Sequence, residues 1–253
     1  MIKSDDFVFE STIFSGGEIH IQIGEIKTKT SVNLELIIND SHDLIEYLLV
    51  VNALKHLGIE IINVLLKYLP YARQDRVCSA GQAFSLDVIN NLLKDKDIYY
   101  TIWDVHNESG YLLPINTRII SQHYLFNCII DDADSIDYFV SPDKGAAQKT
   151  SIIANLHNKP VINFDKVRDP KTGNITGMTI ADTEIKDNSR IMVVDDICDG
   201  GRTFIEVAKI LKNKFNHTRL ELFTTHGIYS KGKKELSMYY DKITCANNIG
   251  ATK

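Results

Sequence analysis

The stretch Val193-Val194-Asp195-Asp196-Ile197-Cys198-Asp199-Gly200-Gly201-Arg202-Thr203 decides the fold class of this chain. It follows the apolar residues Ile191 and Met192 and leads into a segment with helical periodicity. The apolar residues of that segment stand at i, i+3, i+4 and i+7, namely Phe204, Val207, Ala208 and Leu211. The order of strand, acidic residues, glycine turn and amphipathic helix predicts a strand–helix unit of an α/β protein.

The same stretch has the chemistry of a phosphate cradle. Glycines let the backbone approach a ligand closely, and the free N–H groups and dipole of a helix start attract phosphate. Asp195 and Asp196, at the strand end, are expected to bind sugar hydroxyls or a magnesium ion carried by the ligand. An ordinary Asp-Gly-Gly turn is the alternative. The apolar strand, the acidic residues, the glycine pair and the helix start follow one another in the expected order, however, and this favours a site for a phosphorylated ribose.

Length and composition limit the function classes. The chain has 253 residues, enough for one large α/β domain or two smaller ones, and 44% of them are hydrophobic, as in ordinary globular proteins. The net charge of −5 does not favour a nucleic-acid partner. No apolar stretch is long enough to span a bilayer, so no membrane partner is expected.

Cysteine spacing and the amino terminus indicate a compartment. The four cysteines lie far apart and form no CxxC pair, which argues against a disulfide framework and a zinc site. The first ten residues lack the apolar core of a signal peptide. We therefore expect a cytoplasmic protein. Cys198 is interpreted as a small side chain that fills space in the packing.

Strand-like and helix-like segments alternate along the whole chain. Apolar runs predict strands at 19–23, 34–38, 61–66, 98–103, 138–140, 161–164, 191–194 and 220–223, and helices follow Ser41, Ser85 and Gly145. The almost unbroken run 61–66 predicts a buried parallel strand. The alternation predicts an α/β fold of doubly wound, mainly parallel sheets flanked by helices. The segment 113–122 has few periodic signals, which places a domain boundary near residue 119 and gives domains 1–119 and 120–253.

Ligands of doubly wound sheets bind beyond the carboxyl ends of the strands, so those ends are the places to look for chemistry. The strand 61–66 precedes a loop from Tyr71 to Arg76, whose two guanidinium groups suit polyphosphate. A surface Arg–Asp ion-pair loop is an equally good interpretation of that loop alone. Asp104 and His106 follow the next strand, where a magnesium site and a lone loop histidine both remain possible.

Two further strand ends carry charged residues. Asp143 follows the strand 138–140, and Lys166 and Arg168 follow the strand 161–164 with a spacing that lets both reach one anion. Residues 169–174 have turn composition and predict a mobile hairpin or lid. The short lysine run 231–234 is interpreted as a solvated surface.

These blocks together resemble the ribose-phosphate diphosphokinase family, the synthetases of phosphoribosyl diphosphate. The resemblance extends from about residue 14 to 230 and lies in the segments 14–18, 71–76, 104–106, 141–143 with 166–168, 193–203 and 225–230. It implies two type I phosphoribosyltransferase-like domains, with the ATP-binding arginine loop in 1–119 and the ribose 5-phosphate site in 120–253.

The resemblance also implies roles for single residues on the ATP side. Arg73, Gln74 and Arg76 would bind ATP, while Phe14 would stack on adenine and Glu18 would hydrogen-bond it from a neighbouring subunit of a homo-oligomer. The cofactor would be Mg²⁺, bridging the ATP phosphates and bound by His106 and Asp143. The catalytic residues would be Lys166 and Arg168, which would stabilise charge on the transferred group.

On the acceptor side, Asp195 and Asp196 would hold the ribose hydroxyls. The 5-phosphate would be bound by the turn and helix start, Asp199, Gly200, Gly201, Arg202 and Thr203. The implied reaction transfers the β,γ-diphosphoryl group of ATP to the C1 hydroxyl of ribose 5-phosphate and releases AMP.

Some positions depart from the family pattern. Gly16 stands in place of an aspartate of the adenine hairpin, Gly200 in place of a threonine, and Arg202 in place of a small residue. Family members also continue beyond the equivalent of Lys253, which implies a shortened carboxyl end.

Three functions remain open at this point. The first is the active diphosphokinase. The second is a phosphoribosyltransferase that consumes phosphoribosyl diphosphate, against which the arginine loop and the Asp104–His106 segment argue. The third is a non-catalytic regulatory homologue, against which the presence of Lys166 and Arg168 argues.

Overall fold

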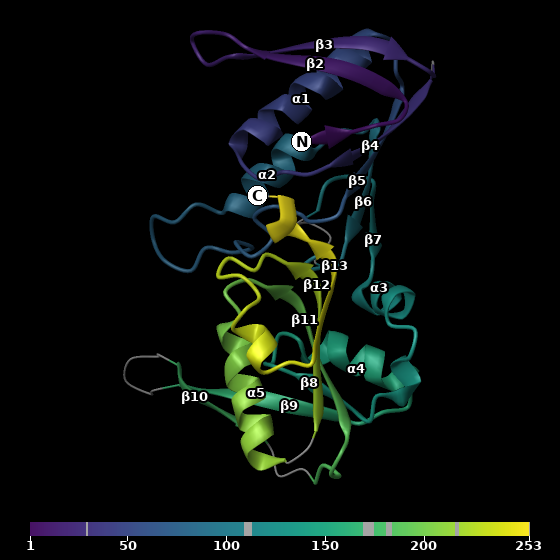
Figure 1. Ribbon diagram of the computed structural model, residues 1–253. Coiled ribbons are helices and arrows are strands. Elements are labelled where there is room, and N and C mark those ends of the chain that lie inside the picture. Colours follow the sequence, from purple (N-terminus) through teal and green to yellow (C-terminus); the bar gives the residue numbers. More distant parts are fainter. Residues whose placement is uncertain (29, 109–112, 169–174, 181–183, 216–217, 253) are drawn as a thin grey trace. The chain divides into compact units, whose positions relative to one another are not determined.

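The computed structural model describes residues 1–28, 30–108, 113–168, 175–180, 184–215 and 218–252 (Figure 1). At 166–168, 175–178, 251 and 252 it describes the backbone alone. The chain divides into two compact units, Met1–Ile120 and Ser121–Lys253. We call them unit 1 and unit 2 and describe each by itself.

Unit 1 is built on a five-stranded sheet whose strands run in the order β1-β4-β5-β6-β7. The edge strand β1 is antiparallel to β4, and the other neighbours are parallel. The strands are β1 (Ile2–Lys3), β4 (Ser31–Leu36), β5 (Ile61–Leu66), β6 (Ile98–Trp103) and β7 (Thr117–Ile120). Strands β2 (Phe7–Ile13) and β3 (Ile19–Ile26) form a separate antiparallel hairpin.

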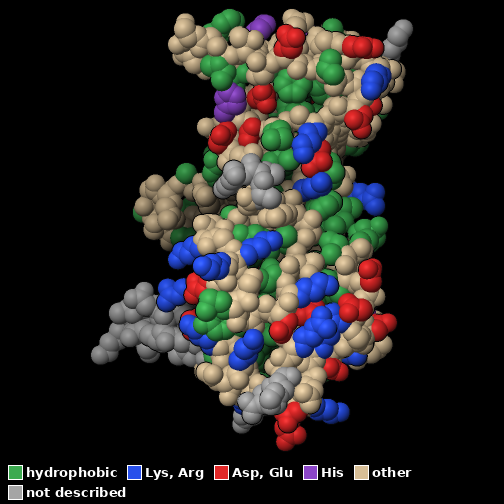
Figure 2. All heavy atoms as spheres, viewed as in Figure 1, with side chains coloured by type: hydrophobic (Ala, Val, Ile, Leu, Met, Phe, Trp, Pro, Cys, Tyr) green, Lys and Arg blue, Asp and Glu red, His purple; other side chains and the backbone are tan. Residues whose placement is uncertain are grey.

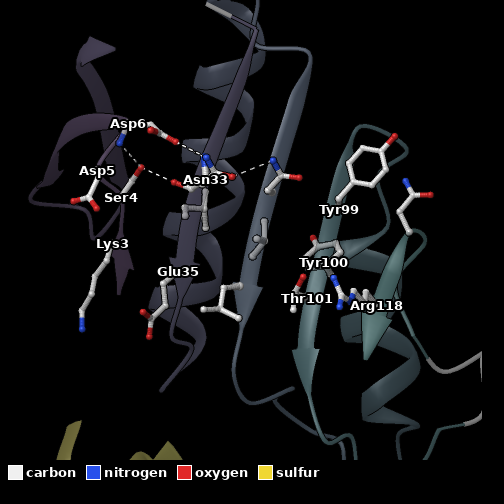
Figure 3. A pocket seen from close by; sticks show the side chains of 15 residues that line it. Lys3, Ser4, Asp5, Asp6, Asn33, Glu35, Tyr99, Tyr100, Thr101 and Arg118 are labelled. Carbon is white, nitrogen blue, oxygen red and sulfur yellow. Dashed lines mark hydrogen bonds between the residues drawn. The ribbon is translucent and has the colours of Figure 1, made fainter. Parts of the chain in front are cut away.

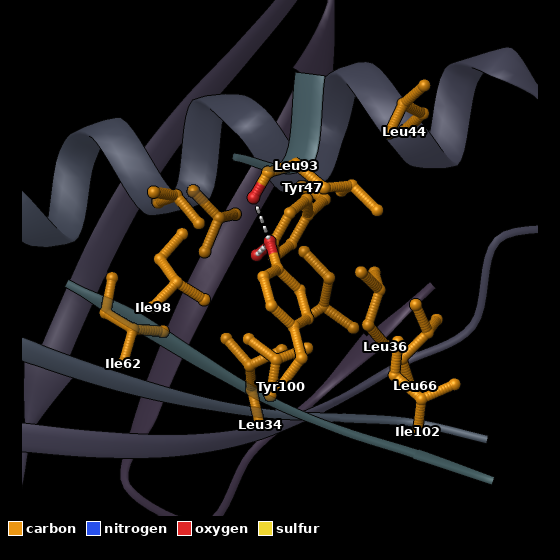
Figure 4. Close-up of a cluster of buried hydrophobic side chains, with 14 of the residues drawn as sticks. Leu34, Leu36, Leu44, Tyr47, Ile62, Leu66, Leu93, Ile98, Tyr100 and Ile102 are labelled. Atoms are coloured by element: carbon orange, nitrogen blue, oxygen red, sulfur yellow. Dashed lines mark hydrogen bonds between the residues drawn. The ribbon is translucent and has the colours of Figure 1, made fainter. Parts of the chain in front are cut away.

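Two helices cover one face of this sheet, α1 (Ser41–His56) and α2 (Ser85–Leu93). Asp40 caps α1, because its side chain accepts a hydrogen bond from the Asp43 backbone N–H at 3.0 Å. At the centre of the core the hydroxyls of Tyr47 and Tyr100 lie 2.8 Å apart, and Tyr100 donates to the Leu93 carbonyl at 2.9 Å (Figure 4). Burial raises the pKa of both tyrosines, which therefore stay neutral.

The other face of the unit 1 sheet is partly exposed, which corrects the expectation of a buried strand at 61–66. Side chains of β5 alternate: Ile62 and Val64 are buried, whereas Ile61 is 41% exposed. A shallow pocket on this face includes Asn33, whose backbone N–H and side-chain amide donate to Asp6 at 2.6 and 2.9 Å (Figure 3). The described residues that line it include no predicted site residue.

Unit 2 contains a six-stranded sheet in the order β10-β9-β8-β11-β12-β13. All neighbours are parallel except β10, which is antiparallel to β9. The strands are β8 (Tyr138–Ser141), β9 (Val161–Arg168), β10 (Ile175–Ile180), β11 (Arg190–Cys198), β12 (Arg219–Gly227) and β13 (Lys242–Asn248). The helices are α3 (Gln122–Ile129), α4 (Ala147–Leu156) and α5 (Arg202–Lys214).

Helices cover both faces of the unit 2 sheet. Val193 of β11 belongs to the core that contains the apolar face of α5, whereas Met192 and Val194 belong to the core formed with α3 and α4. The four α5 residues with helical spacing, Phe204, Val207, Ala208 and Leu211, are all buried. The predicted α/β fold with mainly parallel sheets and flanking helices is confirmed.

The visible surface carries intermingled acidic and basic side chains (Figure 2). Among the described residues, no helix combines the length and apolar character needed to cross a membrane. All four cysteines are free thiols.

Candidate functional site

The phosphate cradle of unit 2 begins where the central strand β11 ends. β11 pairs with β8 on one side and β12 on the other, and α5 starts four residues after Cys198. Gly201 is the N-cap of α5 and has φ +78°, a conformation that favours glycine. The N-cap residue is a glycine and so supplies no side-chain cap. The first backbone N–H groups of α5 are therefore oriented to bind an anion.

Gly201 also has little room for a side chain. A Cβ atom there would lie 3.2 Å from the side chain of Leu236, in the short turn Leu236–Met238. Thus both the backbone conformation and the packing favour glycine at this position.

Asp195 and Asp196 lie near the carboxyl end of β11. The Asp196 backbone N–H donates to Asp195 Oδ1 at 2.8 Å, and the amide of Gln122 on α3 donates to the Asp195 carbonyl at 2.7 Å. Burial raises the pKa of Asp195 well above its usual value, and the charges of Asp196 and Asp143 raise it further. This cluster of carboxylates would be stabilised by hydroxyl donors or a cation.

Asp143 stands beyond the end of β8 and organises the turn before α4. Its Oδ1 accepts hydrogen bonds from the backbone N–H groups of Gly145 and Ala146 at 2.9 and 3.2 Å. Ser141 Oγ donates to the Asp143 carbonyl at 2.6 Å. The charge contribution to Asp195 shows that the structure brings the predicted metal ligand Asp143 near the predicted ribose ligands.

Lys166 and Arg168 belong to β9, which extends four residues beyond the predicted strand end at residue 164. Their backbones pair with Met178 and Ile175 of β10, so they lie on a β-hairpin. Their side chains, and the predicted lid residues 169–174, lie outside the described residues.

The arginine loop of unit 1 is held by Asp75. Arg76 donates through Nε and Nη2 to the two Asp75 carboxylate oxygens, both at 2.7 Å. Asn107 Nδ2 donates to Asp75 Oδ2 at 2.8 Å, which links this loop to the segment after β6. The hydrogen bonds from Arg76 are the main cause that lowers the Asp75 pKa to about 2. In the described conformation Arg76 therefore stabilises the loop.

The remaining predicted residues of unit 1 lie on the loops after β5 and β6 and on the hairpin. Gln74 donates its backbone N–H to the Tyr71 carbonyl at 2.8 Å, and Tyr71 has φ +61°. Arg73 and His106 are exposed on the loops that follow two neighbouring strands, since β5 and β6 pair directly. Buried Asp104, with φ +38°, anchors the second loop by donating its backbone N–H to the Ile120 carbonyl at 2.8 Å.

Phe14 and Glu18 lie at the turn of the β2–β3 hairpin. The Phe14 backbone N–H donates to the Glu18 carbonyl at 2.9 Å, and the Phe14 side chain is 54% exposed. The Glu18 carboxylate lies over Gly16, where a Cβ atom would come within 2.4 Å of Glu18 Oε2. An exposed ring and carboxylate at a hairpin tip are available to a ligand or another subunit.

Across the described parts of the chain, no three His, Cys, Asp or Glu side chains gather as a metal-binding group. Mg²⁺ commonly binds proteins through one or two carboxylates plus substrate phosphates and water. Asp195 and Asp196 supply carboxylate oxygens, which suit a hard cation that arrives with a phosphorylated ligand. The donor set therefore fits a substrate-borne Mg²⁺ better than a resident metal.

Two residues that position the site, Asn107 and Gln122, have no clear signal in the sequence. Neither was predicted as a site residue, and the role of Gln122 depends on α3 packing beside β11 and β12. The lysine run after β12 was interpreted as a solvated surface, although its loop contacts the glycine turn.

Two family models match the chain in succession. The N-terminal domain of ribose phosphate pyrophosphokinase matches residues 7–96, and the phosphoribosyl transferase domain matches residues 115–252. The ribose-phosphate pyrophosphokinase of Pyrococcus furiosus is 28% identical over 249 residues, covering 93% of this chain and 84% of that protein. That of Mycoplasmopsis pulmonis is 30% identical over 233 residues, covering 87% of this chain and 70% of that protein.

A solved structure has the same fold. The crystal structure of phosphoribosylpyrophosphate synthetase from Mycobacterium smegmatis matches with a TM-score of 0.76 at 19% identity. The match covers 95% of this chain and 86% of that one.

Proposed function

The chain belongs to the ribose-phosphate pyrophosphokinase family of diphosphotransferases, and we propose that it transfers the diphosphoryl group of ATP to C1 of ribose 5-phosphate. The products are 5-phosphoribosyl 1-diphosphate and AMP. The observation that carries this proposal is the pairing of an acidic strand end with a helix that has glycine at its N-cap in unit 2. Such a site suits a ribose that bears a phosphate.

The arginine loop of unit 1 supports a synthetase over a transferase that consumes phosphoribosyl diphosphate. A transferase needs no second nucleotide site, whereas Arg73 and Gln74 lie on a loop that Asp75 and Arg76 hold in place. The family model that matches this unit describes the N-terminal domain of ribose phosphate pyrophosphokinase. We assign ATP to Arg73, Gln74 and Arg76, and the adenine ring to Phe14 and Glu18.

The proposed mechanism relies on positioning and electrostatics. The helix start from Asp199 to Thr203 holds the 5-phosphate, while Asp195 and Asp196 accept hydrogen bonds from the ribose hydroxyls. The C1 oxygen then attacks the β-phosphorus of ATP, and the bond from that phosphorus to the α,β-bridging oxygen breaks. AMP leaves with this oxygen, and the hydroxyl proton passes to solvent. Lys166 and Arg168 stabilise the charge on the transferred group.

His106 and Asp143 would hold the Mg²⁺ that accompanies ATP. The ion would supply neutralisation of phosphate charge. Asp143 would bind the ion while its Oδ1 still accepts the hydrogen bonds that hold the turn before α4.

The test measures AMP formation from ATP with and without ribose 5-phosphate, at saturating Mg²⁺. We expect AMP that depends on ribose 5-phosphate and appears together with phosphoribosyl diphosphate. Lys166→Ala should lower kcat by about a hundredfold or more and change the Kd for ATP by less than about threefold, because its role lies in the transition state. Lys159→Ala, on the loop before β9, is the control.

Two outcomes would contradict the proposal. Wild-type protein that forms no ribose-dependent AMP would favour a regulatory homologue. Orotate- or purine-dependent consumption of phosphoribosyl diphosphate, without AMP formation from ATP, would favour a transferase.

A further inference from the structure

The loop that follows β12 is attached to the phosphate cradle by its backbone. The N–H groups of Ile228 and Tyr229 donate to the Cys198 carbonyl at 2.8 and 3.1 Å. The Ser230 N–H donates to the Asp199 carbonyl at 3.2 Å. These three bonds fix the loop at the strand end from which the glycine turn departs.

Lys231 of this loop lies against the glycine pair. Its Cδ and Cε atoms are both 3.7 Å from the position of a Cβ atom on Gly200, and Ser230 Oγ is 3.8 Å from it. Gly200 has no side chain, so the lysine stem lies close to its backbone. The ammonium group is one bond beyond Cε, and this places a positive charge at the turn.

The other contacts of the loop hold it in this arrangement. Tyr229 has φ +49°, and the Lys233 ammonium lies 4.2 Å from the centroid of the Tyr229 ring. Leu236 packs on Gly201. Lys233 is thus directed to an aromatic ring, whereas Lys231 is directed to the phosphate turn.

From this geometry we propose that Lys231 is a substrate-binding residue that contacts the 5-phosphate of ribose 5-phosphate. The inference rests on the proposed function and deepens its acceptor site. α5 begins with Arg202 directly after the glycine pair, and Lys231 supplies a cation from the β12 loop. A lysine ammonium binds phosphate as a compact point charge, and a sugar phosphate carries close to two negative charges.

Calorimetric titration with ribose 5-phosphate, in the absence of ATP, tests the proposal. We expect Lys231→Met to weaken binding about tenfold and Lys231→Arg to weaken it by less than about threefold, because arginine retains the charge. Lys212→Met is the matched control: it removes one exposed lysine from the same unit, about 15 Å from the start of α5. Titration with ribose, which lacks the phosphate, should give the same Kd for Lys231→Met and wild type.

The outcomes separate this inference from the proposed function. If wild type and Lys231→Met bind ribose 5-phosphate equally, Lys231 is not a ligand and the proposed function stands. If the variant loses affinity for ribose and ribose 5-phosphate alike, the residue has a structural role and the inference is wrong. If wild type neither binds ribose 5-phosphate nor forms AMP from ATP, both proposals are wrong.

Discussion

Asp75 is the residue on which the arrangement of the arginine loop depends. Its buried carboxylate accepts a two-pronged contact from Arg76 and a hydrogen bond from Asn107, so it joins the loops after β5 and β6. Arg73 and His106 lie on these two loops. A change at Asp75 should therefore alter both the stability of unit 1 and the proposed ATP site.

Asp75→Asn keeps the size of the side chain and removes its charge. The lowered pKa of about 2 means that the ionised form stabilises the fold. We expect the variant to lose about 1–2 kcal/mol of unfolding free energy at pH 7. This is less than the full pKa shift would give, because Arg76 is 69% exposed and solvent screens its charge. The difference should persist above the unfolded-state pKa of about 4 and decline as the pH falls toward 2, where the native carboxyl becomes protonated.

Urea unfolding at a series of pH values measures this difference. Asp87→Asn, which changes an exposed carboxylate on α2, is the control and should have little effect. A stability difference that does not vary with pH would show that shape, and not charge, accounts for the effect of Asp75→Asn.

At the scale of elements, β11 and β12 are joined at one end by a buried ion pair and carry the proposed site at the other. Arg190 Nε and Nη2 donate to Glu221 Oε1 and Oε2 at 2.8 and 2.9 Å, and the Glu221 side chain is 1% exposed. Arg190 also binds Asp132 through Nη1 at 2.6 Å. Asp195 is about 17 Å further along β11, at the rise of an extended strand.

We expect Glu221→Ala to lower the unfolding free energy of unit 2 by about 3 kcal/mol, because it leaves a buried guanidinium without its main partner. Glu206→Ala, which breaks an exposed pair with Lys209 on α5, should cost less than about 1 kcal/mol. Denaturant unfolding measures both variants. Under conditions where Glu221→Ala remains folded, its KM for ribose 5-phosphate should match wild type; a tenfold rise would contradict the separation of the two ends.

The spacing of apolar residues predicted the strands and helices in which that spacing is regular. It did not predict the elements in which the spacing is irregular. β11 and the buried face of α5 followed from apolar residues at strand and helix spacing. The run at β5 predicts a strand buried on both faces, yet Ile61 and Leu65 face the partly exposed side of the sheet, because an apolar run does not show how many helices will cover it. The small strand β1 and the edge strand β13 lack strong patterns and were not predicted.

The predicted site residues also divide into those with a local sequence signal and those whose position depends on tertiary packing. The position of Gly201 follows from local backbone chemistry and could be predicted from the sequence. The pairing of Arg76 with Asp75 was one of two equal interpretations, and Gln122 reaches β11 only through tertiary packing. Contacts between segments distant in sequence, such as Lys231 with Gly200, have no local signal.

At the scale of the whole molecule, the β2–β3 hairpin suits a site shared between subunits. It forms its own two-stranded sheet apart from the five-stranded sheet, and its tip presents Phe14 and Glu18 to the surroundings. We propose that the protein acts as a homo-oligomer in which the hairpin of one subunit completes the adenine site of another. Each active site would then need Lys166 from one chain and Phe14 from its neighbour.

Complementation tests this shared site. Lys166→Ala and Phe14→Ala proteins should each have little activity alone, the first in kcat and the second through a raised KM for ATP. When the two are co-expressed in equal amounts, about one quarter of the sites should combine an intact Lys166 with an intact neighbouring Phe14, from random assembly of the two chains. We therefore expect AMP formation at low ATP to recover to about one quarter of the wild-type rate.

The control for this recovery is a mixture of two preparations of Lys166→Ala, which should stay inactive. Mixing the separately purified variants without exchange of subunits should also give only the sum of their own rates. Co-expressed variants that stay at this sum would show that Phe14 and Lys166 serve a site within one chain. The same result would contradict the need for an oligomer in ATP binding, while ribose-dependent AMP formation by wild type would still support the proposed reaction.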